Sequence, residues 1–357
     1  MGGVSDFATA EVRVHFFQER IVRMVTHWRD HPAVQQLEVA YLDRERDAIL
    51  KAISLGLDFD LAWPLVKPLV IALTPYMERR GHWDAWYTLL NRAIATAQKL
   101  TDLNGETTLT ALLARLCQRM SRPQEVVHYY RRSIRLARQT GNRFEEARAC
   151  SNLGFLYIDG GHWWRAEALS YHALAIFEGL ESAHGQAHTH NHLGVLFVRQ
   201  RQWDSAEIHL QRACEIWRQQ NDVHSLIYGF LNLGLLYGEQ AMPEKAVDVL
   251  NRALQFAESS GEQSLVGGIL NNLAIAHRFS GNFREALRLA LEAEKLHRHF
   301  SLKLELAQVW HNLGLIYTCI GELIIAIRFL EASKRMYLQL NHTSGVKAVT
   351  ADLERFT

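Results

Sequence analysis

Leucine recurs at a fixed interval of forty residues along most of the chain, and this period constrains the fold more than any other feature. The eight positions are Leu73, Leu113, Leu153, Leu193, Leu233, Leu273, Leu313 and Leu353. A period that holds without slippage over so many steps is typical of a stacked repeat array. Each unit of such an array buries its apolar face only against its neighbours, so function lies on the surface that the stack creates.

Small residues keep the same period as the leucine. The position after it reads Thr74, Ala114, Gly154, Gly194, Gly234, Ala274 and Gly314. A second small column, thirteen residues after the leucine, contains Ala166, Ala206, Ala246, Ala286 and Ala326. Helix axes that pack closely require Gly, Ala or Ser at the crossing point. The two columns therefore predict two antiparallel helices in close contact within each unit.

The last full unit carries a recognisable motif. Residues 310–317 read Trp-His-Asn-Leu-Gly-Leu-Ile-Tyr, which is the W-x2-L-G-x2-Y pattern of the tetratricopeptide repeat. The chain resembles this family in a long, forty-residue variant over about residues 61–357. The resemblance implies an all-α fold, a right-handed superhelical solenoid of seven helical hairpins with N-terminal helices and a C-terminal capping helix.

Turn residues divide the chain into three expected segments. We predict an N-terminal helical segment over 1–60 with helices at 7–29 and about 34–56, repeats over 61–340, and a capping helix within 341–357. The expected hairpins cover 61–100, 105–140, 145–180, 185–220, 225–260, 265–300 and 305–340.

A second resemblance covers the first hundred residues. His15-Phe16-Phe17, Leu42-Asp43-Arg44-Glu45 and Arg79-Arg80-Gly81-His82-Trp83 follow in the order seen at the entry to the repeat sensor arms of STAND-type signalling NTPases. Those proteins have a nucleotide-binding core, whereas no G-x-x-x-x-G-K-[ST] motif occurs here. The resemblance implies a sensing arm that acts by binding.

Composition excludes several other classes. The formal net charge of +1 gives no bias toward nucleic acid or an anionic membrane. No apolar run reaches the roughly 18 residues of a membrane span. Residues 1–6 lack the basic start and apolar run of a signal peptide. The four cysteines are far apart with no C-x-x-C pair, so we expect reduced thiols and a cytoplasmic location.

A polar column precedes the leucine, and the family resemblance places it on the concave groove. It contains Asn152, His192, Asn232, Asn272 and Asn312. Asn is a mediocre helix former, so its recurrence in helices calls for a reason. Either the amides bind the backbone of a polypeptide ligand, or each bonds its own or a neighbouring helix and specifies stacking. Adjacent expected groove positions are Arg148, His188, Asn191, Tyr228, Asn271 and His311.

A histidine run is the nearest approach to a metal motif. His184, His188 and His192 lie at i, i+4 and i+8, so they share one helix face, but no carboxylate or cysteine has a matching spacing. We therefore expect no metal and no cofactor. Paired carboxylates, a nucleophile elbow and a phosphate loop are also missing from the sequence, and we expect no enzyme activity.

The expected function is recognition of a protein or peptide along the concave groove, as a scaffold or as the sensor module of a signalling switch. Two alternatives stay open. The chain could self-associate as a structural scaffold, or it could be the small-molecule sensor arm of a regulator. No contact with nucleic acid or a membrane is expected.

Overall fold

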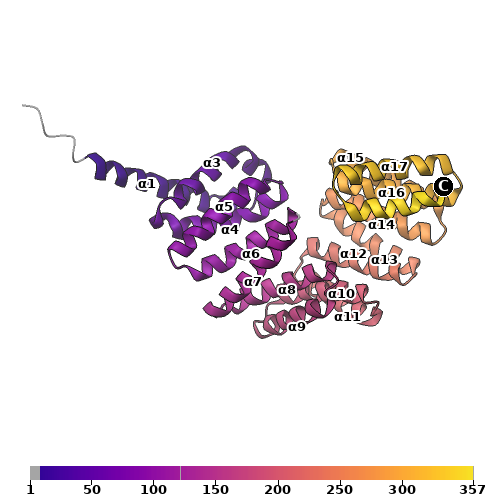
Figure 1. The fold of residues 1–357 in the computed structure, drawn as a ribbon, viewed down its shortest axis with the longest axis horizontal. Helices are drawn as coiled ribbons and strands as arrows, with labels where there is room; N and C mark the ends of the chain where they lie inside the picture. Colours follow the sequence, from indigo (N-terminus) through magenta and orange to yellow (C-terminus); the bar gives the residue numbers. More distant parts are fainter. Residues whose placement is uncertain (1–8, 121, 357) are drawn as a thin grey trace, which may run out of the picture. The chain divides into compact units, whose positions relative to one another are not determined.

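The computed structural model describes residues 9–120 and 122–356, and within these ranges the chain is helical without a β-strand (Figure 1). The expectation about residues 1–6 lies outside the described residues. Packing divides the chain into two compact units, residues 1–153 and 154–357.

Helices follow one another without interruption in both units. The first unit contains α1 (Thr9–Asp30), α2 (Pro32–Gln35), α3 (Val39–Leu57), the 3₁₀ helix η1 (Asp60–Ala62), α4 (Trp63–Arg79), α5 (Trp83–Lys99), α6 (Leu103–Arg119) and α7 (Pro123–Thr140). The boundary between the units falls within α8 (Arg143–Asp159).

The second unit continues with helices of nearly equal length. They are α9 (Trp163–Gly179), α10 (Ala183–Arg199), α11 (Trp203–Gln219), α12 (Val223–Glu239), α13 (Pro243–Ser259), α14 (Gln263–Phe279), α15 (Phe283–His299), α16 (Lys303–Ile320), α17 (Leu323–Gln339), α18 (Thr343–Leu353) and the 3₁₀ helix η2 (Glu354–Phe356).

Within each compact unit, consecutive helices pack as hairpins, and the hairpins stack in chain order. In the second unit the hairpins are formed by α10 and α11, α12 and α13, α14 and α15, and α16 and α17. The second helix of each hairpin also packs on the first helix of the next hairpin. This arrangement confirms the all-α repeat fold expected from the leucine period. The division into the segments 1–60, 61–340 and 341–357 stays a prediction.

The N-terminal helices differ from the expected pattern in one respect. The second helix was predicted from about residue 34, but α3 begins at Val39. The cause is local: Pro32 starts a separate one-turn helix, α2, and Leu37 then adopts a left-handed backbone with φ 52°. A left-handed residue cannot continue an α-helix, so the chain must begin a new one.

A left-handed turn residue recurs at intervals of twenty residues in the described part of the array and ends the helix before it. Among these residues are Gly141, Gly161, Glu181, Arg201, Asn221, Ala241, Gly261 and Gly281. The residue after the turn bonds back to a carbonyl five positions earlier, as in Asp222 N to Trp217 O at 2.9 Å. This is the hydrogen-bond pattern of a Schellman motif, which ends helices at a defined residue. The forty-residue period is therefore two helices of equal length with two similar turns.

The glycines of the small column lie where two helices of a hairpin touch. A Cβ added to Gly194 would meet Leu210 Cγ at 2.5 Å and the Leu210 backbone nitrogen at 3.3 Å. Gly268, in contrast, has nothing within 4 Å of the same hypothetical atom.

We expect Gly194→Ala to destabilise the protein by about 1–3 kcal/mol, because the added methyl group overpacks the hairpin. Gly268→Ala is expected to stabilise it by about 0.5–1 kcal/mol, since alanine is the better helix former and meets no neighbour. Thermal unfolding of the two variants measures this difference. Equal shifts in both would contradict the assigned packing.

Candidate functional site

Two of the asparagines predicted to line the groove form a hydrogen bond with the first helix of the preceding hairpin. Asn232 Nδ2 donates to Asn191 Oδ1 at 2.8 Å, which joins α12 to α10. Asn312 Nδ2 donates to Asn271 Oδ1 at 3.1 Å, which joins α16 to α14. Both pairs are 41 residues apart. At these positions the amides contribute to the stacking of successive repeats.

Asn272 departs from this pairing. The residue 41 positions before it is Leu231, whose side chain can accept no hydrogen bond. The Asn272 amide accordingly makes no hydrogen bond with other described side chains or backbone groups. It is half-buried and lines a cavity. A half-buried amide without an internal partner is available to a ligand.

The cavity has a volume of about 300 Å³ and lies between α12, α13 and α14. Its twelve lining residues are Gly234, Leu235, Gly238, Glu239, Ala241, Pro243, Ala246, Leu250, Asn272, Ile275, Ala276 and Phe279. Only Asn272 and Glu239 among them have polar side chains. At the edge, Leu235 is 38% exposed and Phe279 65% exposed. The site is an apolar recess with one free amide beside it.

One glycine explains why the recess occurs in this unit. Gly238 occupies the position that holds Ile158 and Val198 in the two preceding repeats, and both of those side chains are buried. A Cβ on Gly238 would meet nothing within 4 Å, so the space next to it is open. Sequence reasoning missed this site, although the substitution is visible as a glycine in an otherwise larger column.

The other predicted groove residues divide between the two units. In the first unit, Asn152 is half-buried, and Arg148 forms an ion pair with Glu145 at 2.7 Å. In the second unit, His311 contacts Asp352 through Nε2 at 2.7 Å. The assignment of these residues to ligand binding stays a prediction.

Three further predicted positions are aromatic or imidazole side chains of the second unit. The His192 ring lies 4.5 Å from that of Phe155. Tyr228 is 43% exposed and packs edge-to-face against His224. His188 packs edge-to-face against Trp217, with ring centroids 5.3 Å apart. Burial lowers the pKa of His188 to about 4, so its imidazole is neutral at pH 7.

The structure corrects one expectation about the histidine run, namely that no carboxylate accompanies it. The sequence offered no carboxylate at a matching spacing, but Asp222 lies beside His184 and His188, with donor atoms of all three within 4.8 Å of one another. The spacing rule failed because Asp222 comes from the start of α12, one repeat further along the chain.

Comparison with known families agrees with this architecture. Tetratricopeptide repeat models match residues 108–144 and, in overlapping segments, 145–219, 185–259 and 225–299, which together cover more than half of the chain. The stacked helical hairpins define a helical repeat protein. The chain belongs to the tetratricopeptide repeat family. No curated protein sequence matches it.

Several solved structures share the fold over most of the chain. Aspartyl phosphate phosphatase F from Bacillus subtilis is 12% identical, with 94% of this chain and 96% of that chain covered and a TM-score of 0.63. NprR in complex with its cognate peptide NprX is 13% identical over 93% of this chain and 83% of that chain, with a TM-score of 0.58. At such identities the likeness establishes the fold alone.

The resemblance to signalling NTPases also has a structural counterpart. A STAND protein with a tetratricopeptide repeat sensor from Pyrococcus horikoshii is 13% identical, with a TM-score of 0.58. The match covers 79% of this chain but 42% of that protein. The chain therefore corresponds to part of a longer protein in this comparison.

Two remaining observations concern membranes and thiols. No helix in the described part of the chain is long and apolar enough to cross a membrane. The four cysteines are free thiols, of which Cys117, Cys150 and Cys214 are buried and Cys319 is exposed.

Proposed function

We propose that the chain is a non-catalytic peptide-binding sensor module. In this proposal an apolar side chain of the bound polypeptide enters the recess between α12, α13 and α14. The observation that carries the proposal is the Asn272 amide, which has no hydrogen-bond partner among the described residues and stands beside an apolar recess. An amide offers both a donor and an acceptor, which together match the backbone of a bound peptide.

The chemistry of the recess favours binding over catalysis. Its polar side chains are an amide and a carboxylate, and neither histidine, cysteine, serine nor lysine lines it. A small apolar cavity with few polar groups is typical of recognition sites. The similarity to NprR, which was solved with a cognate peptide, supports the same class of ligand. Free, mostly buried thiols favour the cytoplasm as the compartment.

The proposal is tested by selecting peptides from a random display library on the purified 357-residue chain. We expect the selected sequences to share an apolar anchor residue. For one such peptide, Asn272→Ala should weaken binding by about 1–2 kcal/mol, or roughly tenfold, because a hydrogen-bonded group in the complex loses its partner. The melting temperature should hold or rise, since alanine is the better helix former.

Asn232→Ala is the matched control. It removes the hydrogen bond to Asn191, so we expect a loss of about 0.5–1.5 kcal/mol in stability with peptide affinity unchanged. If peptides bind equally well to the Asn272 variant, or if none are selected at all, the proposed site is wrong. Light scattering tests the alternative that the chain self-associates. Self-association would appear as a molar mass that rises with protein concentration.

A further inference from the structure

A repeating cap residue places a carboxylate at the start of α12. The residues that begin successive first helices include Asp102, Asn142, Ser182 and Asp222, forty positions apart. Each accepts a hydrogen bond from the backbone N–H three residues later, as Asp222 Oδ1 does from Ser225 at 3.1 Å. An aspartate that caps a helix in this way uses one carboxylate oxygen and keeps the other for a second partner.

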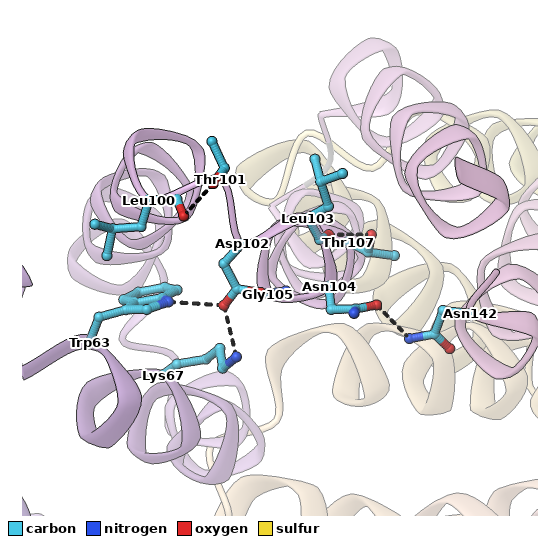
Figure 2. A network of polar contacts seen from close by, with 10 residues as sticks. All are labelled: Trp63, Lys67, Leu100, Thr101, Asp102, Leu103, Asn104, Gly105, Thr107 and Asn142. Atoms are coloured by element: carbon cyan, nitrogen blue, oxygen red, sulfur yellow. Dashed lines mark hydrogen bonds and ion pairs between the residues drawn. The ribbon is translucent and has the colours of Figure 1, made fainter. Parts of the chain in front are cut away.

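Asp102 shows what the second oxygen does in the first unit (Figure 2). Its Oδ1 caps α6 through Gly105 at 2.9 Å, while Oδ2 accepts from Trp63 Nε1 at 2.9 Å and from Lys67 Nζ at 2.8 Å. The cap carboxylate is thus satisfied by a cation and an indole. Trp63 and Lys67 precede the cap by 39 and 35 residues.

At Asp222 those two partners are absent. The residues 39 and 35 positions before it are Ala183 and Ala187, which can donate nothing from their side chains. Two imidazoles lie beside the carboxylate instead. They belong to His184 and His188, which directly follow these two alanines in the sequence. Unlike the Lys67 ammonium, an imidazole carries no permanent charge that balances the carboxylate.

The position of His184 beside Asp222 follows from the repeat. In other repeats too, the second residue of the first helix contacts the residue that caps the first helix of the next repeat, 38 positions later. Asn142 Nδ2 donates to Asn104 Oδ1 at 3.4 Å, and His224 Nδ1 lies 3.0 Å from Glu262 Oε1. His188, four residues after His184, lies on the same face of α10, and the two rings are 4.5 Å apart. The three donor groups therefore converge through the regular stacking of α10 and α12.

We propose that His184, His188 and Asp222 bind a zinc ion that links α10 to the start of α12. Two histidines at i and i+4 with one carboxylate are a donor set that zinc uses. Zinc takes ligands at about 2.0–2.2 Å, so donor atoms within 4.8 Å of one another need a small rotation to converge. His184 is exposed and can make this rotation, whereas His188 is held against Trp217. Three protein ligands leave one tetrahedral position for water or for a donor from a bound chain.

The test is calorimetric titration of zinc chloride into the tag-free, metal-stripped 357-residue chain. We expect one zinc ion per chain and a melting temperature that rises with zinc concentration, because the ion binds only the folded site. His184→Ala and Asp222→Asn should each weaken zinc binding at least about tenfold. Asparagine is an equally good helix cap, so Asp222→Asn removes the charge and leaves α12 intact.

His224→Ala is the matched control, because His224 contacts Glu262 in the same way but has Tyr228 in place of a second histidine. This variant should bind zinc as the wild type does. The proposal is overturned if the wild type takes up no zinc, or if His184→Ala and Asp222→Asn bind it normally. It is also overturned if zinc binding depends instead on His209, which forms a separate imidazole pair with His190 at 2.8 Å.

Discussion

Replacing Arg138 and Arg143 together by methionine is expected to lower the free energy of unfolding by about 3 kcal/mol. The two guanidinium groups hold the carboxylate of Glu146 from both sides, at 2.8 Å and 2.7 Å. The Glu146 side chain is only 2% exposed. Without the arginines the buried carboxylate would lose two cationic partners, and breaking a buried ion pair from one side is strongly destabilising. Urea unfolding of the double variant measures the loss.

Two controls separate this cause from a general loss of arginine. Arg135→Met removes an exposed arginine of α7, and we expect it to change stability by less than about 0.5 kcal/mol. Adding Glu146→Leu to the double variant removes the buried charge and should restore much of the stability. A double variant as stable as the wild type would contradict the assignment of this role to the two arginines.

Replacing Gly238 by isoleucine is expected to abolish peptide binding in the recess, with a loss of about a hundredfold or more. A selected peptide would lose the burial of its apolar anchor, which is worth about 1.5–3 kcal/mol for a full side chain, and would also meet the new side chain sterically. The substitution reproduces Ile158 of an earlier unit, and the added Cβ meets nothing within 4 Å.

Folding of the Gly238→Ile variant should be intact. Glycine is the poorest helix former after proline, so the exchange is expected to be neutral or to stabilise α12 by about 0.5 kcal/mol. A loss of binding with an unchanged or higher melting temperature would thus be due to the filled recess. A large drop in melting temperature would instead mean that the space is not open.

The fold was predictable because the pattern repeats at two levels. The small residues that follow Leu193 and Leu233 mark the helix crossings, and the turn residues mark the helix ends. Because every repeat carries the same pattern, a helix boundary that is ambiguous in one repeat can be assigned from the others. The start of α3 at Val39 was not predictable in this way, because that segment precedes the repeats and has no second copy for comparison.

The candidate site was only half predictable, for a physical reason. Asn232 and Asn272 occupy the same column, yet Asn232 bonds the neighbouring repeat whereas Asn272 has no such partner in the described part of the chain. The difference depends on the residue 41 positions earlier, Asn191 in one case and Leu231 in the other. Such a rule emerges only when the helices are placed side by side. The same holds for Asp222, whose neighbours His184 and His188 lie in the first helix of the preceding repeat.

The most direct test of the peptide-binding account is a titration of one selected peptide into three proteins, the wild type, Gly238→Ile and Gly179→Ile. Gly179 is a suitable comparison because it too lies at the end of a helix, faces open space and is outside the recess. The account predicts equal affinity for the wild type and Gly179→Ile, and no measurable binding to Gly238→Ile. Equal affinity for all three proteins would contradict it.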